Sequence, residues 1–573
     1  MRNQLSASSF TGAAAERPWL AFYDEGVPAE ISLPTAPLPG LLREAARRFP
    51  AAPAIHFYGR TLTYAELEAE AMRFAAGLAR AGIEPGERVV VLLPNIPQAV
   101  ICYYGVLLTG AVVVFSNPLF DADTLVYQMR DAQADTIIVL SMFHELVQAV
   151  GQQFAMRRVI YTNLKEYLPR TQRYLFTMLR QEREGHRVPE EEARRALWMS
   201  HLLDDGAAGA RLPDLRPDQP AVILYTSGTT GEAKGALHTH RSLYANAIQA
   251  SSWFVGAEPG QERVFCPLPF SHSYGMTTCM NLSVALSAAM ILLPTFETQN
   301  VLHAIKREKP TIFPGVPPMY ATLNEVRDVR KYGLSSLKAC LSGAAPLPVE
   351  VQEGFERITR ARLVEGYGLT EAGPVTHANP LWGQRRAGSI GLPLPSTEAK
   401  IVDLKTGADL SPRAIGELLV RGPQLMQGYW RRPVETAEVF TADGWLRTGD
   451  AALMTAEGYF QVIERKKEMI VAGTYNIYPR DVEEVLYEHP KILEAAVVGV
   501  PHEDGDTDIK AFVVLRQGER ATQDEVKDFL AERLSSNTLP TSIEFRQALP
   551  RSPIGKVLRR VLIEDTKAAG RRT

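Results

Sequence analysis

Residues 221–235 read AVILYTSGTTGEAKG, four apolar residues followed by a loop rich in glycine and hydroxyl side chains. The apolar run is typical of a buried strand, so the loop leaves a strand end, where open α/β sheets bind ligands. Glycines let backbone N–H groups turn toward an anion, and the hydroxyls and Lys234 add donors and positive charge. The stretch therefore predicts a phosphate-binding loop, with a plain surface connection as the alternative. It is not a P-loop motif, because Gly235 rather than a Ser or Thr follows Lys234.

The surrounding sequence alternates strand and helix patterns. Apolar runs at 88–93, 136–140 and 221–225 predict buried strands, and helical patterns cover 63–81 and 122–132. Two longer apolar stretches, 99–115 and 282–294, are too short or too polar for membrane spans and predict core helix–strand pairs. This alternation predicts an α/β fold with mainly parallel sheets covered on both faces.

The pattern changes near residue 465. Beyond it, the sequence predicts a small α+β module with helices at 479–488 and 523–534 and strands at 494–500 and 509–515. We therefore expect an N-terminal domain over 1–464 and a C-terminal domain over 465–573.

The composition excludes several classes of protein. The 573 residues are 46% hydrophobic with a net charge of -3, so no basic field supports nucleic-acid binding. The four cysteines have neither metal-site spacing nor the density of a disulfide scaffold. Residues 1–20 contain no apolar signal region, and we expect a reduced, cytoplasmic protein.

Four further motifs carry chemistry. Residues 365–371 read EGYGLTE, in which the glycines around Tyr367 permit close approach of a nucleotide; a tight turn with a buried tyrosine is the alternative. Asp450 ends the run GWLRTGD and suits ribose hydroxyls, unless it is an ordinary turn aspartate. The charged run ERKKE at 464–468 and the segment PRSPIGK at 550–556 are weak signals by themselves.

Together, in this order, these segments resemble the adenylate-forming superfamily, and most closely its bacterial long-chain fatty-acid CoA ligases. The resemblance covers about residues 18–560. It implies a large N-terminal domain of mainly parallel sheets flanked by helices, a β-barrel-like subdomain, and a small mobile C-terminal domain. It also implies a reaction in which a medium- to long-chain fatty acid and MgATP give an acyl-adenylate and pyrophosphate, and coenzyme A then displaces AMP.

The resemblance assigns roles residue by residue. The ATP phosphates would be held by the loop residues Thr226, Ser227, Gly228, Thr229, Thr230, Gly231 and Lys234. Adenosine would contact Gly343, Ala344, Ala345, Glu365, Gly366, Tyr367, Gly368, Asp450 and Arg465. Thr370 would contact the α-phosphate, and Thr229 and Glu371 would hold Mg²⁺. Lys556 would neutralise charge between the carboxylate and the α-phosphate, and Lys467 would be the hinge of the mobile domain.

The acid is expected beside residues 265–275, which read FCPLPFSHSYG. His272 would orient the carboxylate or gate the acyl tunnel, and a hydrogen-bonded core histidine is the alternative. Small residues would keep that tunnel open, namely Gly275, Gly315, Gly343, Ala344 and Ala345. Thr474 stands at a position where close relatives have glycine. The resemblance therefore supports the adenylation step more strongly than the coenzyme A step.

Other functions stay open at this point. One alternative is an adenylating ligase for an aromatic acid or a carrier protein, and another is a nonenzymatic acyl or nucleotide sensor. Residues 165–187 group apolar side chains with arginines; we favour a helix packed on the large domain, with a helix on the inner membrane face as the alternative. The expected partners are fatty acid, ATP and coenzyme A, with no nucleic acid; a homodimer stays open.

Overall fold

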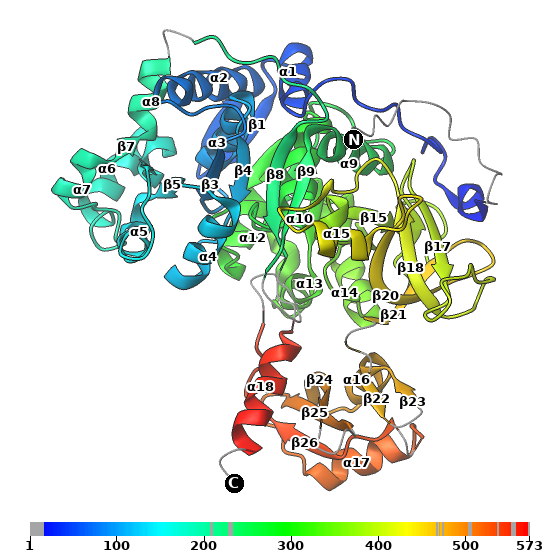
Figure 1. Ribbon diagram of the computed structural model, residues 1–573. Helices are drawn as coiled ribbons and strands as arrows, with labels where there is room; N and C mark the ends of the chain where they lie inside the picture. The colour runs from blue at the N-terminus through cyan, green and yellow to red at the C-terminus, as the bar shows by residue number, and fades with distance from the viewer. Residues whose placement is uncertain are drawn as a thin grey trace.

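The computed structural model describes residues 17–206, 210–226, 233–465, 468, 470–472, 475–501, 507–535, 538–551 and 557–570. Within these ranges, two large sheets and a smaller one form the large domain, and a separate α+β unit follows (Figure 1).

The first large sheet contains the strand that precedes the glycine loop. Its strands are parallel from β8 to β7, whereas β8, β9 and β19 are antiparallel. In spatial order the strands are β19 (Gly428–Tyr429), β9 (Gly235–Thr239), β8 (Pro220–Tyr225), β4 (Val112–Phe115), β3 (Arg88–Leu92), β5 (Thr136–Leu140), β6 (Arg158–Thr162) and β7 (Leu197–Trp198).

The second large sheet is parallel from β1 to β14 and antiparallel at both edges. In spatial order its strands are β16 (Leu392–Pro393), β15 (Val375–Ala378), β14 (Arg362–Gly368), β13 (Ala339–Ser342), β12 (Ile312–Gly315), β10 (Arg263–Cys266), β11 (Ala289–Leu292), β1 (Pro53–Phe57) and β2 (Arg60–Thr63).

Helices cover both faces of each sheet. Alternate strand residues face opposite cores: Val89 and Val91 enter a core shared by the two sheets, whereas Val90 and Leu92 enter an outer one. The shared core includes α1 (Pro39–Arg48), α2 (Tyr64–Arg80), α3 (Pro97–Leu108) and α9 (His240–Trp253). The outer faces pack on α4 (Ala122–Ala132) and α5 (His144–Gly151), and on α12 (Thr298–Glu308), α13 (Pro317–Asn324) and α14 (Val349–Thr359). The predicted α/β fold with covered parallel sheets is confirmed.

Local sequence signals set several element boundaries. Thr63 caps α2 in a reciprocal capping box with Glu66, and the Asp121 side chain caps α4 by accepting the backbone N–H of Thr124 at 2.9 Å. The predicted strands at 88–93 and 136–140 and the helices at 63–81 and 122–132 are confirmed to within a residue at each end. The apolar stretches 99–115 and 282–294 form helix–strand pairs, α3 with β4 and α11 (Leu282–Ala285) with β11.

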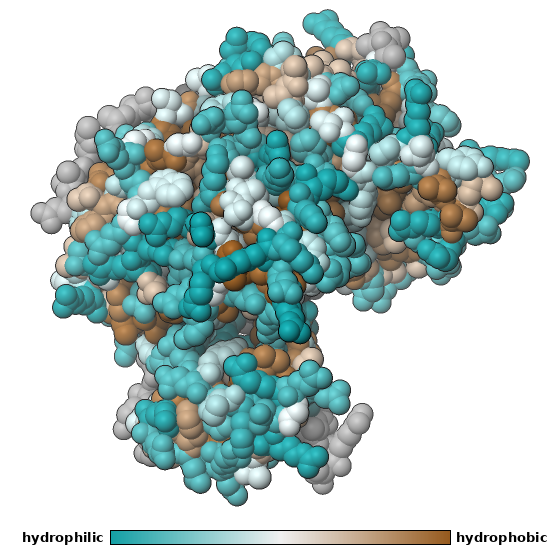
Figure 2. Space-filling model, turned by 180° about the vertical axis from the view of Figure 1, so that it is seen from behind, coloured by the Kyte–Doolittle hydropathy of each residue, from teal (hydrophilic) through white to brown (hydrophobic). Residues whose placement is uncertain are grey.

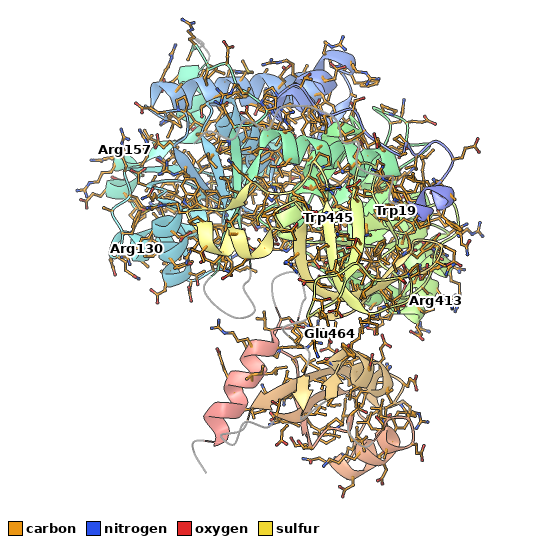
Figure 3. All side chains as sticks on the ribbon, turned by 45° about the vertical axis from the view of Figure 1, so that its right-hand side comes forward. Trp19, Arg130, Arg157, Arg413, Trp445 and Glu464 are labelled. Atoms are coloured by element: carbon orange, nitrogen blue, oxygen red, sulfur yellow. The ribbon has the colours of Figure 1, made fainter. Side chains whose placement is uncertain are left out.

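A third, antiparallel sheet forms the smaller part of the large domain. Its strand order is β17 (Glu398–Val402), β18 (Gly416–Arg421), β20 (Leu446–Met454) and β21 (Phe460–Arg465). The N-terminal segment packs against this sheet: Arg17 forms an ion pair with Glu398 at 2.8 Å, and the buried Trp19, which is labelled in Figure 3, lies edge-on to Phe460. These contacts fix the sheet that carries Asp450.

The C-terminal unit contains an antiparallel hairpin, β22 (Ile470–Ala472) with β23 (Tyr475–Ile477), and the sheet β24 (Ile492–Pro501), β25 (Thr507–Leu515) and β26 (Ser542–Phe545). Its helices are α16 (Pro479–Tyr487), α17 (Gln523–Ala531) and α18 (Arg559–Gly570). Glu464 lies at its junction with the large domain (Figure 3), where its Oε2 accepts the backbone N–H of Arg480 at 3.0 Å. The boundary at 464/465 stays a prediction.

In the segment 165–187 the structure differs from the helix that we expected to pack on the large domain. Tyr167 and Leu168 are buried as expected, but α6 (Arg170–Leu179) does not bury its other apolar residues. Four of its side chains are more than half exposed: Tyr174 at 66%, Leu175 at 53%, Met178 at 65% and Leu179 at 67%. The expectation of a packed amphipathic helix was therefore wrong for most of α6, since only Phe176 faces the core.

Hydrophobic and hydrophilic groups mix on the back of the molecule. The right-hand edge of Figure 2, to which the turned view brings α5 and α6, carries brown groups bordered by teal ones. Across the described residues, no helix combines the length and apolar character that a membrane crossing needs.

Candidate functional site

The stem of the glycine loop is the hydrogen-bonded end of the β8–β9 hairpin. Tyr225 is opposite Gly235 in the β8–β9 ladder, and the N–H of Thr226 donates to the carbonyl of Lys234 at 2.9 Å. The tip, with Ser227, Gly228, Thr229, Thr230 and Gly231, lies outside the described residues, so their phosphate-binding roles stay predictions. Lys467, Thr474 and Lys556 also lie outside the described residues.

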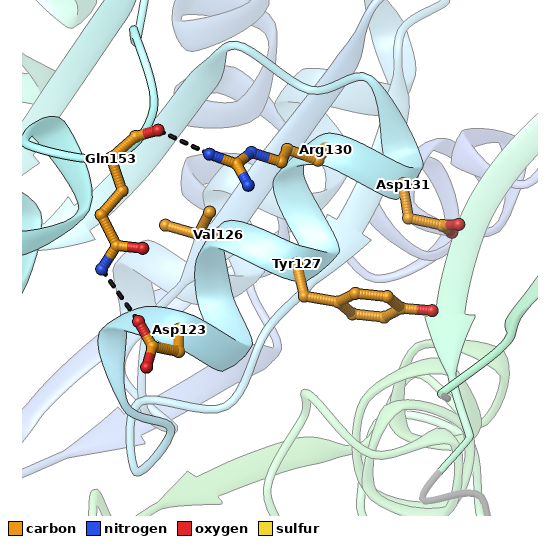
Figure 4. A pocket seen from close by; sticks show the side chains of 6 residues that line it. All are labelled: Asp123, Val126, Tyr127, Arg130, Asp131 and Gln153. Carbon is orange, nitrogen blue, oxygen red and sulfur yellow. Dashed lines mark hydrogen bonds between the residues drawn. The ribbon is translucent and has the colours of Figure 1, made fainter. Parts of the chain in front are cut away.

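Helix α4 supports this stem from one side. Tyr127 donates from its hydroxyl to the carbonyl of Ala233 at 2.8 Å, and Asp131 accepts the hydroxyl of Tyr225 at 2.7 Å. A groove of about 480 Å³ is lined by Tyr127 and Asp131 with Asp123, Val126, Arg130 and Gln153 (Figure 4). None of these residues is a predicted site residue, and the contacts of Tyr127 and Asp131 identify them as supports of the loop stem.

The end of β14 brings two predicted nucleotide residues together. Tyr367 donates a short hydrogen bond from its hydroxyl to Oδ2 of the buried Asp450. Asp450 is in turn paired with Arg465 across the β20–β21 ladder. An added Cβ at Gly368 would lie 2.0 Å from the carbonyl oxygen of Pro374, so this glycine is required by close backbone packing. The ring of Tyr367 is therefore fixed beside the residues expected to bind ribose.

Thr370 and Glu371 follow in a short turn, Thr370–Ala372, that other strands hold in place. Nε2 of His238 on β9 donates to the carbonyl of Thr370 at 2.7 Å. Burial lowers the pKa of His238 to about 4, so the ring is neutral at pH 7. The hydroxyl of Tyr429 on β19 donates to Oε1 of Glu371 at 2.7 Å. Burial, and then the negative charge of Glu371, raise the pKa of Tyr429, so the hydroxyl keeps its proton.

Glu371 fits the predicted magnesium role. Within the described ranges, only its Oε1 takes part in a side-chain hydrogen bond, which leaves Oε2 for a cation. Mg²⁺ is usually held by one or two carboxylates together with substrate phosphates. Thr229, the second residue predicted to bind Mg²⁺, lies outside the described residues.

Glu365 is buried at the junction with the C-terminal unit, with 8% of its surface exposed. Burial raises the pKa of Glu365 to about 7, and the positive charge of Arg480 offsets only part of that shift. This carboxyl group therefore changes charge near neutral pH. Its predicted contact with a nucleotide stays a prediction.

The acid-side segment contacts the turn at Thr370. Ser273 Oγ lies 3.4 Å from Thr370 Oγ1, and the hydroxyl of Thr277 donates to the carbonyl of Gly373 at 2.5 Å. Nδ1 of His272 accepts the backbone N–H of Tyr274 at 3.1 Å, so a neutral His272 ring carries its proton on Nε2. His272 is half-buried, and its carboxylate role stays a prediction.

Tyrosines fill the space beside the predicted tunnel glycines. The hydroxyl of Tyr274 donates to the carbonyl of Leu341 at 2.9 Å, and its ring lies 3.0 Å from the position of a Cβ added to Gly343. The hydroxyl of Tyr320 lies 2.9 Å from the equivalent position at Gly315. These two glycines therefore accommodate protein side chains, and an acyl tunnel beside them stays a prediction. Ala344 follows in a left-handed conformation, with φ +67°.

Sequence reasoning gave no role of its own to three residues of this arrangement: His238, Tyr274 and Tyr429. Each acts through contacts between segments far apart in the chain. A glycine before an aromatic residue at 428–429 is the one local signal that could have drawn attention to Tyr429.

Comparisons with known proteins find related sequences and structures along most of the chain. The family model described as AMP-binding enzyme matches residues 42–430, and the model described as AMP-binding enzyme C-terminal domain matches 481–556. The chain is 44% identical over 552 residues to a long-chain-fatty-acid–CoA ligase of Bacillus subtilis strain 168, covering 96% of this chain and 98% of the relative. It is 34% identical over 554 residues to a protein of the same name from Escherichia coli O157:H7, with 96% and 98% covered. ATP-bound MatB from Rhodopseudomonas palustris superposes with a TM-score of 0.79 at 27% identity, covering 92% of this chain and 99% of that one.

Proposed function

The chain belongs to the family of AMP-binding enzymes, and on that premise we propose that it joins a medium- to long-chain fatty acid to coenzyme A with ATP. In the first step a carboxylate oxygen attacks the α-phosphorus of ATP, and the bond to pyrophosphate breaks. In the second step the sulfur of coenzyme A attacks the acyl carbon, AMP leaves, and the thiol proton passes to solvent.

The observation that carries this proposal is the contact between Ser273 and Thr370. It joins the segment assigned to the acid with the turn assigned to the α-phosphate. Reaction between two anions requires them to be held close together in one orientation. The contact supports such an arrangement, because it brings two segments that are distant in the chain together.

The named residues would share the work of the first step. Lys234 and the loop hydroxyls would bind the β- and γ-phosphates and stabilise the departing pyrophosphate. Tyr367 would lie on the adenine, Asp450 and Arg465 would bind the ribose, and Glu371 would hold Mg²⁺, which neutralises phosphate charge when bound. His272 would orient the carboxylate.

Mass spectrometry of products tests the proposed function. The protein is incubated with MgATP and acids from acetate to oleate, with and without coenzyme A. We expect acyl-CoA and AMP from the longer acids. Acyl-AMP that persists despite coenzyme A would favour another acceptor, and no adenylate from any acid would contradict the proposal.

We also propose that α6 binds an anionic membrane surface. Its four exposed apolar side chains lie in a segment, 165–187, that contains six basic and three acidic residues. An apolar helix face bordered by arginines suits the boundary between lipid headgroups and acyl chains. A long-chain acid partitions into that layer, so docking there would deliver the substrate.

Vesicle flotation tests this surface. Wild type should float with vesicles that contain phosphatidylglycerol, and the triple variant Leu175→Ser, Met178→Ser, Leu179→Ser should bind about tenfold more weakly. The matched control changes three exposed apolar residues elsewhere, Leu33, Ile415 and Val434, and should float like wild type. Equal binding by both triple variants would contradict the proposal. A dimer in sedimentation that dissociates only in the α6 variant would assign the face to a second copy.

A further inference from the structure

Tyr429 stands beside the predicted phosphate lysine. Strand β19 pairs antiparallel with β9, so that Tyr429 is opposite Ala236. The N–H of the next residue, Trp430, donates to the carbonyl of Gly235 at 2.7 Å. Tyr429 is therefore fixed to the strand that begins directly after Lys234.

The tyrosine contacts both charged residues of the predicted phosphate and metal site. Its hydroxyl donates to Glu371 Oε1 at 2.7 Å, and Lys234 Nζ lies 5.2 Å from the centroid of its ring. A second contact ties the same segment to Glu371, because the N–H of Met426 donates to the Glu371 carbonyl at 2.8 Å. One side chain thus meets a cation with its ring and an anion with its hydroxyl.

The backbone of Tyr429 is held firmly. Its N–H donates to Thr436 Oγ1 at 2.9 Å, on helix α15 (Pro433–Val439). Gly428 has φ +151°, and a Cβ there would come within 2.7 Å of the Thr436 methyl group. The strand and α15 therefore leave Tyr429 little freedom, as positioning a neighbouring carboxylate requires.

Lys234 and Glu371 form no ion pair with each other in the part of the chain that the structure describes, although both contact Tyr429. A direct ion pair would offset much of each charge. A neutral hydroxyl and an aromatic face instead hold the two side chains while the charges persist.

We infer that Tyr429 is a positioning residue that keeps Glu371 and Lys234 apart and sets both for binding ATP with Mg²⁺. The inference rests on the proposed function, because that function assigns ATP to this site. It adds a residue that works through Glu371 and Lys234 without touching substrate.

Calorimetric titration with ATP, with and without Mg²⁺ and without any acid, tests the role of the hydroxyl. Tyr429→Phe keeps the ring and removes the donor to Glu371. In wild type we expect Mg²⁺ to strengthen ATP binding. In the variant this gain should fall about tenfold, the effect of losing a hydrogen bond to a charged group, while Mg²⁺-free affinity changes less than about twofold. Tyr429→Leu should also weaken Mg²⁺-free binding, because Lys234 loses the aromatic face.

A double variant tests whether the hydroxyl of Tyr429 acts through Glu371. In a Glu371→Gln background, Tyr429→Phe should cause no further loss of the Mg²⁺-linked gain. The matched control is Tyr23→Phe, which removes a hydroxyl that donates to the carbonyl of Pro393 at 2.5 Å, outside the predicted site. The inference is overturned by wild-type Mg²⁺ linkage in Tyr429→Phe, by an additive effect in the Gln background, or by a much larger loss of thermal stability than in Tyr23→Phe. A wild-type protein that binds no ATP would overturn the proposed function as well.

Discussion

His238 and Glu365 show how burial sets the charge of single residues near the site. The pKa of His238 falls to about 4, so its ring is neutral and donates to Thr370. The pKa of Glu365 rises to about 7, so its carboxyl group gains charge only near neutral pH. In each case burial disfavours the charged form.

Glu365→Gln should change how stability depends on pH. The folded-state pKa of about 7 lies above the ordinary value of 4.5, so the folded state binds a proton that the unfolded state releases in this window. That contribution to stability is complete below pH 4.5 and is lost as pH rises through 7. At pH 8 the Gln variant should therefore be more stable than wild type by about 3 kcal/mol, with little difference at pH 4. Denaturant unfolding at both pH values checks this.

Glu25→Gln is the control for that comparison, because Glu25 is an exposed glutamate. Like most substitutions at an exposed position, it should leave the free energy of unfolding within about 0.5 kcal/mol of wild type. A Glu365→Gln variant that follows wild type across the whole pH range would contradict the raised pKa.

Lys556→Ala should separate the two half-reactions. A cation about 4 Å from the reacting oxygens offsets about 4 kcal/mol at an effective dielectric constant of 20, so adenylation should fall about a thousandfold. Thioester formation from supplied acyl-AMP should continue. The control is Lys527→Ala, which changes another lysine of the C-terminal unit and should leave both steps intact. Equal losses in both half-reactions would contradict the assignment.

At the element scale, the backbone around Gly275 packs closely because glycine has no side chain. A Cβ at Gly275 would lie 2.2 Å from the carbonyl oxygen of Pro269, which is backbone and cannot rotate away. Gly275→Ala should therefore lower the free energy of unfolding by about 3 kcal/mol. Gly151→Ala is the matched control, because its nearest neighbour would be a flexible methionine end at 3.6 Å, and it should be neutral or slightly stabilising. Thermal unfolding of the two variants compares them, and equal midpoints would contradict the packing argument.

Elements with local signals could be predicted from the sequence. The strands at 88–92 and 136–140 are short apolar runs, and Thr63 with Glu66 marks the start of α2. Contacts between distant segments could not be predicted. Tyr429 meets Glu371 only because β19 adds to the edge of β9, and no local pattern encodes that pairing. The exposure of α6 was missed for the same reason, since its apolar spacing is equally consistent with a packed or an unpartnered helix.

The site as a whole joins three parts of the molecule. The loop stem lies between β8 and β9, Thr370 and Glu371 follow β14, and Asp450 lies on the antiparallel sheet. We propose that the C-terminal unit contributes Lys556 to adenylation and then rotates for the second step.

Lys467→Pro tests this rotation. Proline fixes φ, so a hinge there should stop the change between two orientations. Adenylation should persist, and thioester formation from acyl-AMP should fall sharply, when each step is measured separately. Lys467→Ala should leave both steps unchanged. Loss of both steps in the proline variant would argue against a hinge at this position.

Activation of the acid as an acyl-adenylate can be tested by following its carboxyl oxygen. A long-chain acid labelled with ¹⁸O in the carboxyl group is converted with MgATP and coenzyme A, and the mass of the nucleotide product is measured by mass spectrometry. We expect AMP that carries one ¹⁸O, because the carboxylate oxygen becomes bonded to the α-phosphorus and stays there when the thiol displaces AMP. Unlabelled AMP, or ADP with labelled phosphate, would exclude an acyl-adenylate.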